Sequence, residues 1–165
     1  MTREPEQLTT SGRLKFSPVF CDDGRAIVFT ELVDPTLYRL QKLDVATGKV
    51  KPLHTDAPTS EFEPAWAADG QCYAYLKTRS ALSIGIVVRD PQGTVIGDIP
   101  PEPGFFGFRS PTLAPNKSRI AFAYGEGGTQ QIYTSEINGK DRKALTATKG
   151  LNQWPSYSPD GKFIT

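Results

Sequence analysis

The sequence predicts an all-β fold, a partial β-propeller built of four-stranded antiparallel blades, from its repeats, its hairpin patterns and its lack of helical periodicity. Four prolines, Pro18, Pro64, Pro111 and Pro155, recur at spacings of 46, 47 and 44 residues. Apolar residues alternate on both sides of an Asp-Gly turn in these repeats, and no stretch of ten or more residues has a helical pattern. A period in the mid-forties is typical of tandem supersecondary units.

Each proline stands in the same local sequence. A large apolar residue follows two positions later, and an Asp or Asn follows five positions later, with glycine next in every unit except the third, which has Lys117. Glycine accepts the positive φ of a tight hairpin turn, so we expect each proline to open a β-hairpin. The repeated positions are Pro18, Phe20, Asp23 and Gly24; Pro64, Trp66, Asp69 and Gly70; Pro111, Leu113 and Asn116; and Pro155, Tyr157, Asp160 and Gly161.

A second pair of strands follows in the first three units. A run of alternating or continuous apolar residues leads to a turn, and a short run closes on an aliphatic residue. A unit of about 46 residues holds four strands of ordinary length joined by short turns, and four-stranded units in tandem indicate propeller blades. The third strands are expected at 38–43, 84–88 and 132–137, and the fourth strands at Leu53, Ile99 and Leu145.

The repeats divide the chain into parts of one propeller domain. Residues 1–13 are expected to form an outer strand that closes a preceding or last blade, and 14–57, 58–103 and 104–149 to form three blades. Residues 150–165 correspond to the first half of a fourth, truncated blade. The chain then holds about three and a half blades, as a fragment or a truncated reading frame. Open strand edges predict that the isolated chain self-associates.

The sequence of the repeat resembles that of one propeller family. Residues 155–164 read Pro-Ser-Tyr-Ser-Pro-Asp-Gly-Lys-Phe-Ile, which is similar to the TolB-like propeller repeat, also called the WD40-like beta repeat. The first three units depart from it at Cys21-Asp22, Ala67-Ala68 and Asn116-Lys117. The Gly-His and Trp-Asp pairs of the Trp-Asp family and the Gly-Gly pair of kelch repeats do not recur. The resemblance implies a parent ring that usually has six blades.

Composition and charge argue against nucleic-acid binding and a membrane span as features of this chain. The chain has 19 basic and 18 acidic residues and a formal charge of +1, so it has no basic field for nucleic acid. Its longest apolar run is far shorter than a membrane span. The N-terminal residues lack the apolar core of a secretory signal, whereas the resemblance implies a periplasmic or extracytoplasmic setting. The compartment stays open at this stage.

The sequence offers no catalytic, cofactor or metal site. His54 is the only histidine, and we expect it on the surface. Neither a Gly-x-Ser-x-Gly motif nor a zinc ligand set is present. Residues 125–129 are rich in glycine but lack the Lys-Ser/Thr ending of a phosphate loop, so a hairpin is expected there. Cys21 and Cys72 have no metal or disulfide spacing, and we expect buried thiols.

One connection is apolar where turns are usually polar. Residues 100–109 link the second unit to the third and combine prolines with three phenylalanines. Links between blades cross one face of a propeller, where exposed aromatic residues commonly anchor partners. The alternative is that the rings fill the wedge between two blades. The candidate protein contacts are Phe105, Phe106, Phe108, Arg109 and Trp154.

The sequence therefore predicts a non-catalytic protein-interaction module that presents loops on one face to a protein partner. By resemblance, the partner is a component of a cell-envelope system of the Tol-Pal type. The alternative is the gating propeller of a prolyl-oligopeptidase-like serine peptidase, whose catalytic domain would lie outside this chain. A third possibility is a fragment with no role of its own, so function must be argued from the site rather than from the fold.

Overall fold

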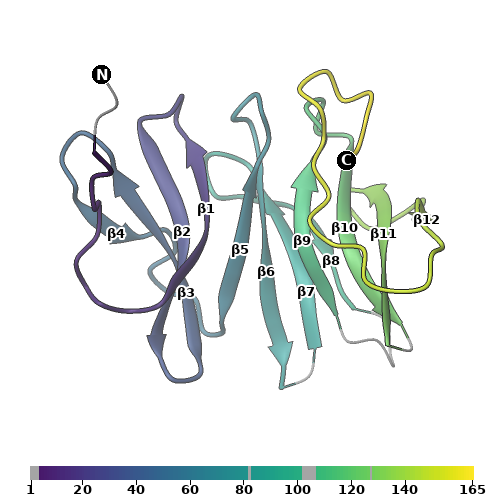
Figure 1. Cartoon of the computed structure of the whole chain (residues 1–165), viewed down its shortest axis with the longest axis horizontal. Helices are drawn as coiled ribbons and strands as arrows, with labels where there is room; N and C mark the ends of the chain where they lie inside the picture. Colours follow the sequence, from purple (N-terminus) through teal and green to yellow (C-terminus); the bar gives the residue numbers. More distant parts are fainter. Residues whose placement is uncertain (1–3, 82, 102–106, 127) are drawn as a thin grey trace.

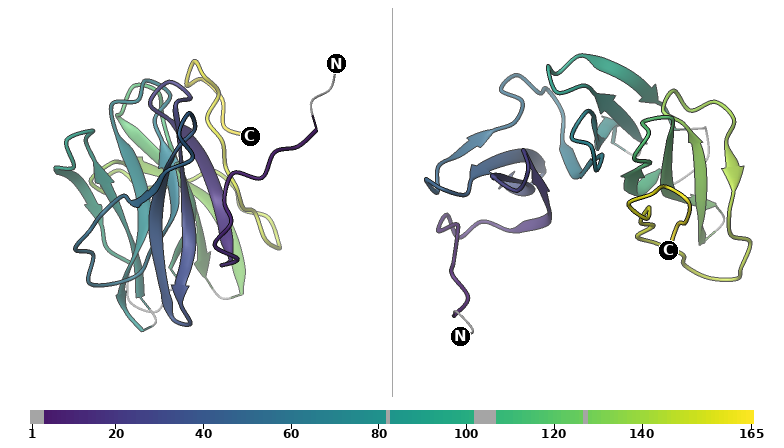
Figure 2. Two further views of the ribbon diagram at one scale, coloured as in Figure 1. Left: turned by 90° about the vertical axis from the view of Figure 1, so that its left-hand side faces the viewer. Right: turned by 90° about the horizontal axis from the view of Figure 1, so that it is seen from above.

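The computed structural model describes residues 4–81, 83–101, 107–126 and 128–165, in which every regular element is a β-strand. Twelve strands form three four-stranded sheets, and the strands of each sheet lie side by side in sequence order. The sheets stand next to one another (Figure 1), and seen from above they follow an arc (Figure 2). We call them blades 1 to 3. The all-β fold of four-stranded blades predicted from the sequence is confirmed.

All neighbouring strands within a blade are antiparallel. In the described ranges there is no helix that is long and apolar enough to cross a membrane. Blade 1 consists of β1 (Lys15–Cys21), β2 (Ala26–Asp34), β3 (Leu37–Asp44) and β4 (Val50–Pro52). Blade 2 consists of β5 (Glu61–Trp66), β6 (Tyr73–Ser80), β7 (Ser83–Arg89) and β8 (Val95–Ile99). Blade 3 consists of β9 (Phe108–Leu113), β10 (Arg119–Glu126), β11 (Thr129–Glu136) and β12 (Lys143–Ala144).

The turn after the first strand has the same conformation in all four repeats. The N–H of Gly24 donates to the carbonyl of Cys21 at 3.1 Å, and Gly70, Lys117 and Gly161 donate to the carbonyl three residues earlier at 2.9, 3.0 and 2.9 Å. Their φ angles are 78°, 68°, 59° and 71°. Lys117 thus adopts the left-handed backbone that glycine provides elsewhere, at a conformational cost that glycine avoids. This explains how the third unit keeps its turn without glycine.

The repeated prolines lie inside the first strands rather than at their starts. Pro18, Pro64 and Pro111 each come three residues after the first residue of β1, β5 and β9. The register of each strand with its neighbour shifts at this point, which marks a β-bulge. A bulge leaves one residue outside the ladder, so proline, which has no N–H, fits there. The expectation that each proline opens its hairpin is therefore wrong by three residues.

The core lies between the blades. Along β10, Ile120 and Phe122 point toward blade 2, while Ala121 and Ala123 point to the opposite face, and all four are fully buried. This alternation is the one that a sheet covered on both faces requires. The cluster between blades 2 and 3 includes Phe62, Cys72, Leu76, Ile86, Val88, Ile99, Phe108, Leu113, Ile120, Phe122 and Tyr124. The cluster between blades 1 and 2 includes Cys21, Ala26, Val28, Leu40, Tyr73, Tyr75 and Val87.

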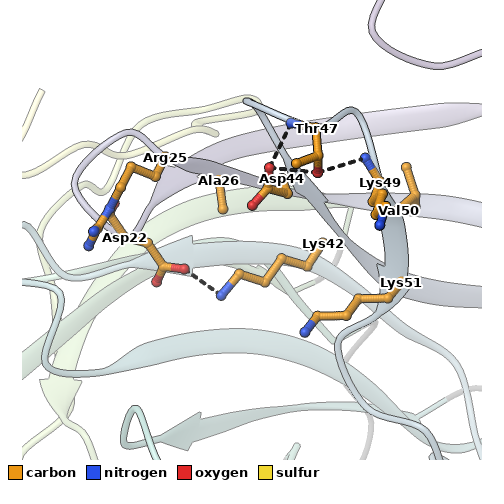
Figure 3. A pocket seen from close by; sticks show the side chains of 9 residues that line it. All are labelled: Asp22, Arg25, Ala26, Lys42, Asp44, Thr47, Lys49, Val50 and Lys51. Carbon is orange, nitrogen blue, oxygen red and sulfur yellow. Dashed lines mark hydrogen bonds and ion pairs between the residues drawn. The ribbon is translucent and has the colours of Figure 1, made fainter.

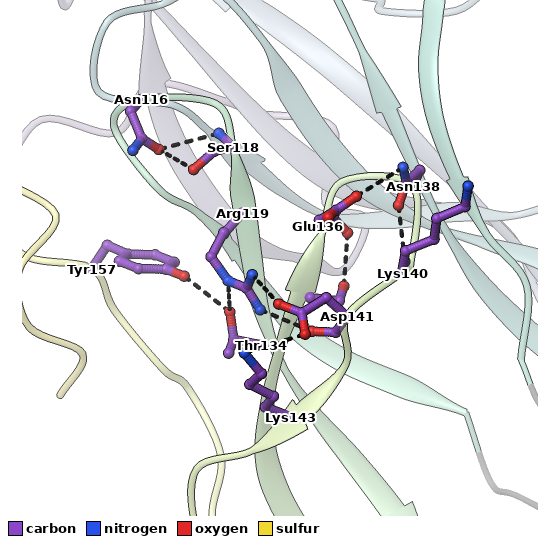
Figure 4. A network of polar contacts seen from close by, with 11 residues as sticks. Asn116, Ser118, Arg119, Thr134, Glu136, Asn138, Lys140, Asp141, Lys143 and Tyr157 are labelled. Atoms are coloured by element: carbon purple, nitrogen blue, oxygen red, sulfur yellow. Dashed lines mark hydrogen bonds and ion pairs between the residues drawn. The ribbon is translucent and has the colours of Figure 1, made fainter.

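The chain after β12 packs on blade 3 and begins another hairpin. Ser156 and Thr165 exchange two backbone hydrogen bonds of 3.0 Å each. The Tyr157 hydroxyl lies 3.3 Å from Oγ1 of Thr134, which also accepts a hydrogen bond from Nε of Arg119 at 3.2 Å (Figure 4). These contacts fix the fourth repeat against the face of blade 3 that carries Ala121 and Ala123. The fourth proline is thereby held near the first strands of the other blades.

The opposite end of the arc is more exposed. Among residues 4–14 no strand is formed, and Leu8 and Thr9 lie beside a hollow lined by Phe29 and Leu43. Phe20, in the apolar column of the first repeat, has 65% of its surface exposed because no sheet packs on this face of blade 1. An outer strand in residues 1–13 needs a partner strand, so that expectation stays a prediction.

Candidate functional site

The first strands of all blades meet along one groove, which we call the axial groove. It has a volume of about 340 Å³. The first strands that line it are on the concave side of the arc in Figure 2. Every repeat contributes to it, since each provides the residue before its repeated proline, and the last three repeats provide the proline as well. The groove is lined by Phe16, Ser17, Glu63, Pro64, Ser110, Pro111, Trp154 and Pro155.

The backbone conformation before each proline places the lining residues. The residue before the proline has a positive φ in every repeat: 50° at Ser17, 49° at Glu63, 49° at Ser110 and 55° at Trp154. Residues other than glycine seldom adopt this backbone conformation, and such strained residues tend to cluster at functional sites. One position of the repeat therefore supplies four side chains of three kinds to one groove: two hydroxyls, a carboxyl and an indole.

Glu63 connects the blades across the groove. Its N–H donates to Oγ1 of Thr30 on blade 1 at 3.0 Å, and its carboxylate accepts a hydrogen bond from the N–H of Ser110 on blade 3 at 2.6 Å. Burial raises the pKa of the Glu63 carboxyl, while the Ser110 hydrogen bond and the charge of Arg109 oppose the rise. Glu63 thus orders the groove and also gives it an acidic group.

An aromatic depression adjoins the axial groove and shares Phe16 and Glu63 with it. It has a volume of about 640 Å³. The rings of Phe16 and Tyr38 meet edge to face at 5.6 Å, and Tyr38 and Phe62 lie 5.7 Å apart. The guanidinium of Arg109 lies over the Phe62 ring at 5.9 Å, a distance at which a cation and an aromatic face attract each other.

The predicted contact residues separate into three groups. Arg109 lines the aromatic depression, and Trp154 lines the axial groove with 77% of its surface exposed. Phe108 is fully buried and meets Phe122 edge to face at 4.9 Å, so its expected role as an exposed contact is wrong and it fills the wedge between blades 2 and 3. Phe105 and Phe106 lie outside the described residues.

A polar cluster at the junction of blades 1 and 2 was missed from the sequence. Nδ1 of His54 lies 2.6 Å from Oε2 of Glu61, and Nε2 lies 2.9 Å from the hydroxyl of Tyr73. The side chains of His54 and Glu61 are only 14% and 2% exposed. Nε of Arg89 donates to the hydroxyl of Tyr75 at 2.9 Å. The expected surface histidine is wrong because His54 packs against residues of the next blade, which local sequence does not reveal.

Both cysteines are free and buried, as predicted. Burial raises the pKa of the Cys72 thiol to about 11, and it also raises that of Cys21. A thiol that stays protonated is a poor nucleophile and a poor metal ligand. Across the described ranges, no three His, Cys, Asp or Glu side chains form a group suited to a metal ion.

The fold has counterparts among solved structures, although no family model matches the sequence. The chain is similar to TolB from Acinetobacter baumannii, with a TM-score of 0.71 and 24% identity over 96% of this chain. It is also similar to an oligogalacturonate lyase in complex with manganese, with a TM-score of 0.64 and 15% identity over 96% of this chain. A prolyl endopeptidase structure matches 94% of this chain with a TM-score of 0.55 and 15% identity.

The chain spans 39%, 48% and 24% of the lengths of these three proteins. At such identities the likeness concerns the fold, which is that of a TolB-like β-propeller. The three neighbours include a lyase and a peptidase, so one fold accommodates different chemistries. The function of this chain is therefore argued from its own groove.

Proposed function

We propose that this chain is a non-catalytic protein-interaction module that binds a segment of a partner protein in the axial groove. The observation that carries the proposal is the convergence of one repeat position, from all four repeats, on a groove with an indole that is 77% exposed. Exposed Trp and Arg side chains are the commonest anchors of protein interfaces. The TolB-like fold favours a partner of the cell-envelope Tol-Pal type, in a periplasmic setting.

The groove suits a short extended segment. Pro64, Pro111 and Pro155 form rigid walls, so little side-chain entropy is lost when a ligand binds. Trp154 offers an apolar face, while Glu63 and Arg109 offer opposite charges within reach of one segment. The chain's one histidine, His54, is engaged with Glu61 and Tyr73 away from this groove. Binding is therefore the role that these residues support best.

A random peptide library selected against the purified chain tests this function. Peptides that bind the groove should lose at least about tenfold in affinity with Trp154→Ala and with Arg109→Ala, a loss equivalent to about 1.4 kcal/mol. The matched control is Val95→Ala, an exposed apolar side chain on the outer strand β8, 49% exposed. Peptides that bind the Trp154 and Arg109 variants as tightly as the control would contradict the proposal, and so would the absence of any enriched peptide.

A second candidate function is the gate of a prolyl-oligopeptidase-like serine peptidase. It is favoured by the similarity to the prolyl endopeptidase over 94% of this chain. In that case the catalytic serine, histidine and acid belong to another part of the protein. Reading the encoding DNA on both sides of this frame distinguishes the two functions, since a serine-hydrolase domain with a Gly-x-Ser-x-Gly motif would support the gate.

We also propose that the isolated chain self-associates through the two ends of its arc. At one end Phe20 is 65% exposed, and at the other end Phe163 is 66% exposed. Large apolar side chains gathered on an uncovered sheet face favour association. Within the arc, apolar side chains of the neighbouring blades cover both faces of blade 2. We expect the exposed apolar side chains at the two ends to be covered in a similar way by a second copy of the chain.

A further inference from the structure

Another hollow lies on the outer part of blade 1, away from the axial groove. It has a volume of about 700 Å³, and all of its lining residues come from the β1–β2 turn, from β2 and β3, and from β4 with the turn before it (Figure 3). Four of the lining side chains are basic and two are acidic, although the whole chain has a formal charge of only +1. The lining residues are Asp22, Arg25, Ala26, Lys42, Asp44, Thr47, Lys49, Val50 and Lys51.

Both acidic groups of the hollow already have partners. Oδ2 of Asp22 lies 2.6 Å from Nζ of Lys42. Oδ1 of Asp44 accepts hydrogen bonds from the N–H of Thr47 at 2.8 Å and from the Thr47 hydroxyl at 2.7 Å. These hydrogen bonds lower the pKa of Asp44 and keep the carboxylate ionised. Arg25 also has an acidic partner, because its Nη2 lies 3.5 Å from Oδ2 of Asp23, so the unpaired positive charge comes from Lys49 and Lys51.

Two of the lysines form no ion pair within the described part of the chain, although the charge of Lys49 contributes to the lowered pKa of Asp44. Among the described residues, neither Lys49 nor Lys51 forms an ion pair, and both are exposed. Lys42 and Lys51 lie directly opposite each other on β3 and β4, and their side chains extend in the same direction (Figure 3). Like charges that face each other across a ladder destabilise the pair. Asp22 already offsets the charge of Lys42, so Lys51 is the member of this pair whose charge a bound anion would neutralise.

Lys51 lies on β4 and Lys49 in the turn just before it, and this position has a simpler use as well. β4 is the outer strand of blade 1, and charged residues on such an edge prevent pairing with other chains. That protection requires charge on the edge strand alone. Arg25 and Lys42, each paired with an aspartate, carry the hollow inward to the β1–β2 turn and to β3, so it extends beyond the edge strand.

We infer that this hollow binds a carboxylate-rich segment of a partner protein, as a contact separate from the axial groove. The volume of about 700 Å³ exceeds the needs of a single small anion and lies within the range of sites for larger ligands. Lysine ammonium groups are flexible point charges that attract carboxylates without a fixed fork geometry. Several such charges spread along a hollow fit a ligand whose charges are also spread, as in a run of Asp and Glu.

Fluorescein-labelled hexaglutamate is the probe for this site. We expect saturable binding at low salt that weakens as NaCl rises from about 50 to about 300 mM, because salt screens exposed charges. The double variant Lys49→Gln, Lys51→Gln should bind at least about tenfold more weakly. The matched control is Lys140→Gln, Lys149→Gln, which removes two exposed charges after β11 and β12. The control should bind as the unchanged chain does.

The probe should also raise the thermal midpoint of the unchanged chain and of the control, but not that of the Lys49 and Lys51 variant. Equal loss of binding in both double variants, or no saturable binding at low salt, would overturn the inference. Trp154→Ala should leave hexaglutamate binding unchanged. A loss of selected-peptide binding in that variant alone therefore separates the axial groove from the basic hollow.

Discussion

His54, Glu61 and Tyr73 show how single residues join two blades. His54 belongs to the connection after β4, whereas Glu61 and Tyr73 belong to β5 and β6. Their distances of 2.6 and 2.9 Å place the imidazole between a carboxylate and a phenol. Burying a carboxylate without a partner costs free energy of folding. The His54 imidazole, through Nδ1, is the partner that offsets this cost for Glu61.

We predict that His54→Leu lowers the free energy of unfolding by about 3 kcal/mol, because it leaves the Glu61 carboxylate buried and unpaired. The double variant His54→Leu, Glu61→Leu should recover a large part of this loss, since no charge remains to be solvated. Urea unfolding of both variants measures the difference. If the double variant is no more stable than the single one, the carboxylate and imidazole do not act as a pair.

Tyr75 and Cys72 predict a loss of stability in alkali. Burial raises the pKa of Tyr75 from 10.0 to about 12 and that of Cys72 from 9.0 to about 11. Between these values the unfolded chain loses a proton that the folded chain keeps. The stabilisation is complete below about pH 9 and falls as pH rises toward 12, by up to about 1.4 kcal/mol per pH unit for each group.

The variant Tyr75→Phe tests this dependence. Phenylalanine keeps the ring but cannot ionise, so the free energy of unfolding should fall less steeply between pH 10 and about 12. Equilibrium unfolding at a series of pH values measures the slope. An identical slope in the variant would show that the Tyr75 phenol ionises equally in both states.

At the scale of elements, the proline bulge is the device that shapes the groove. It recurs in β1, β5 and β9, and a left-handed residue precedes the proline in all four repeats. The bulge turns the strand and aims the side chain of that residue toward the axis of the arc. The strain recurs at the same position in each repeat. The packing of the surrounding blade offsets its cost in free energy.

Ser110 allows a matched test of this strain. Its φ is 49°. Ser110→Val should cost about 2 kcal/mol, because a β-branched side chain opposes a left-handed backbone. Ser110→Gly should change stability by less than about 0.5 kcal/mol, because glycine accepts positive φ. Chemical unfolding of both variants checks the order. Equal stability of the two would mean that Ser110 is not left-handed in solution.

Much of the blade pattern was accessible from the sequence, because strand alternation and turn residues are local signals. The third strands expected at 38–43, 84–88 and 132–137 overlap β3, β7 and β11. The bulges escaped notice because alternation shows neither an inserted residue nor its φ. The pairing of His54 with Glu61 was missed because it depends on how two blades pack. One feature of the sequence could have indicated the groove, namely the residue before each repeated proline. Its role is visible only in the structure, where the first strands bring these residues together.

At the scale of the whole molecule, three blades and the following hairpin form an arc whose two ends differ from its middle. Blade 2 is covered on both faces, and its central strands are buried. The ends instead expose large apolar side chains, among them Phe20 and Phe163. The groove depends on all three blades and on the fourth repeat, so its shape depends on the whole arc.

We predict that the isolated chain forms dimers or larger species as its concentration rises. The variant Phe20→Ser, Phe163→Ser should shift this equilibrium toward the monomer, because it removes apolar surface from both ends. Val95→Ser, on β8 and 49% exposed, is the control and should associate as the unchanged chain does. Light scattering across a concentration series measures the mass. A monomer at high concentration would contradict self-association through the ends.

The most direct test of the axial groove is a map of backbone amide resonances with a library-selected peptide. Ser17, Glu63, Ser110 and Trp154 each have an N–H beside a repeated proline, and together they sample the groove from all four repeats. If the groove is the binding site, their resonances shift together as the peptide is added, while those of the outer strands β4 and β8 stay in place. Shifts confined to the outer strands, with these four amides unchanged, would contradict the proposed function.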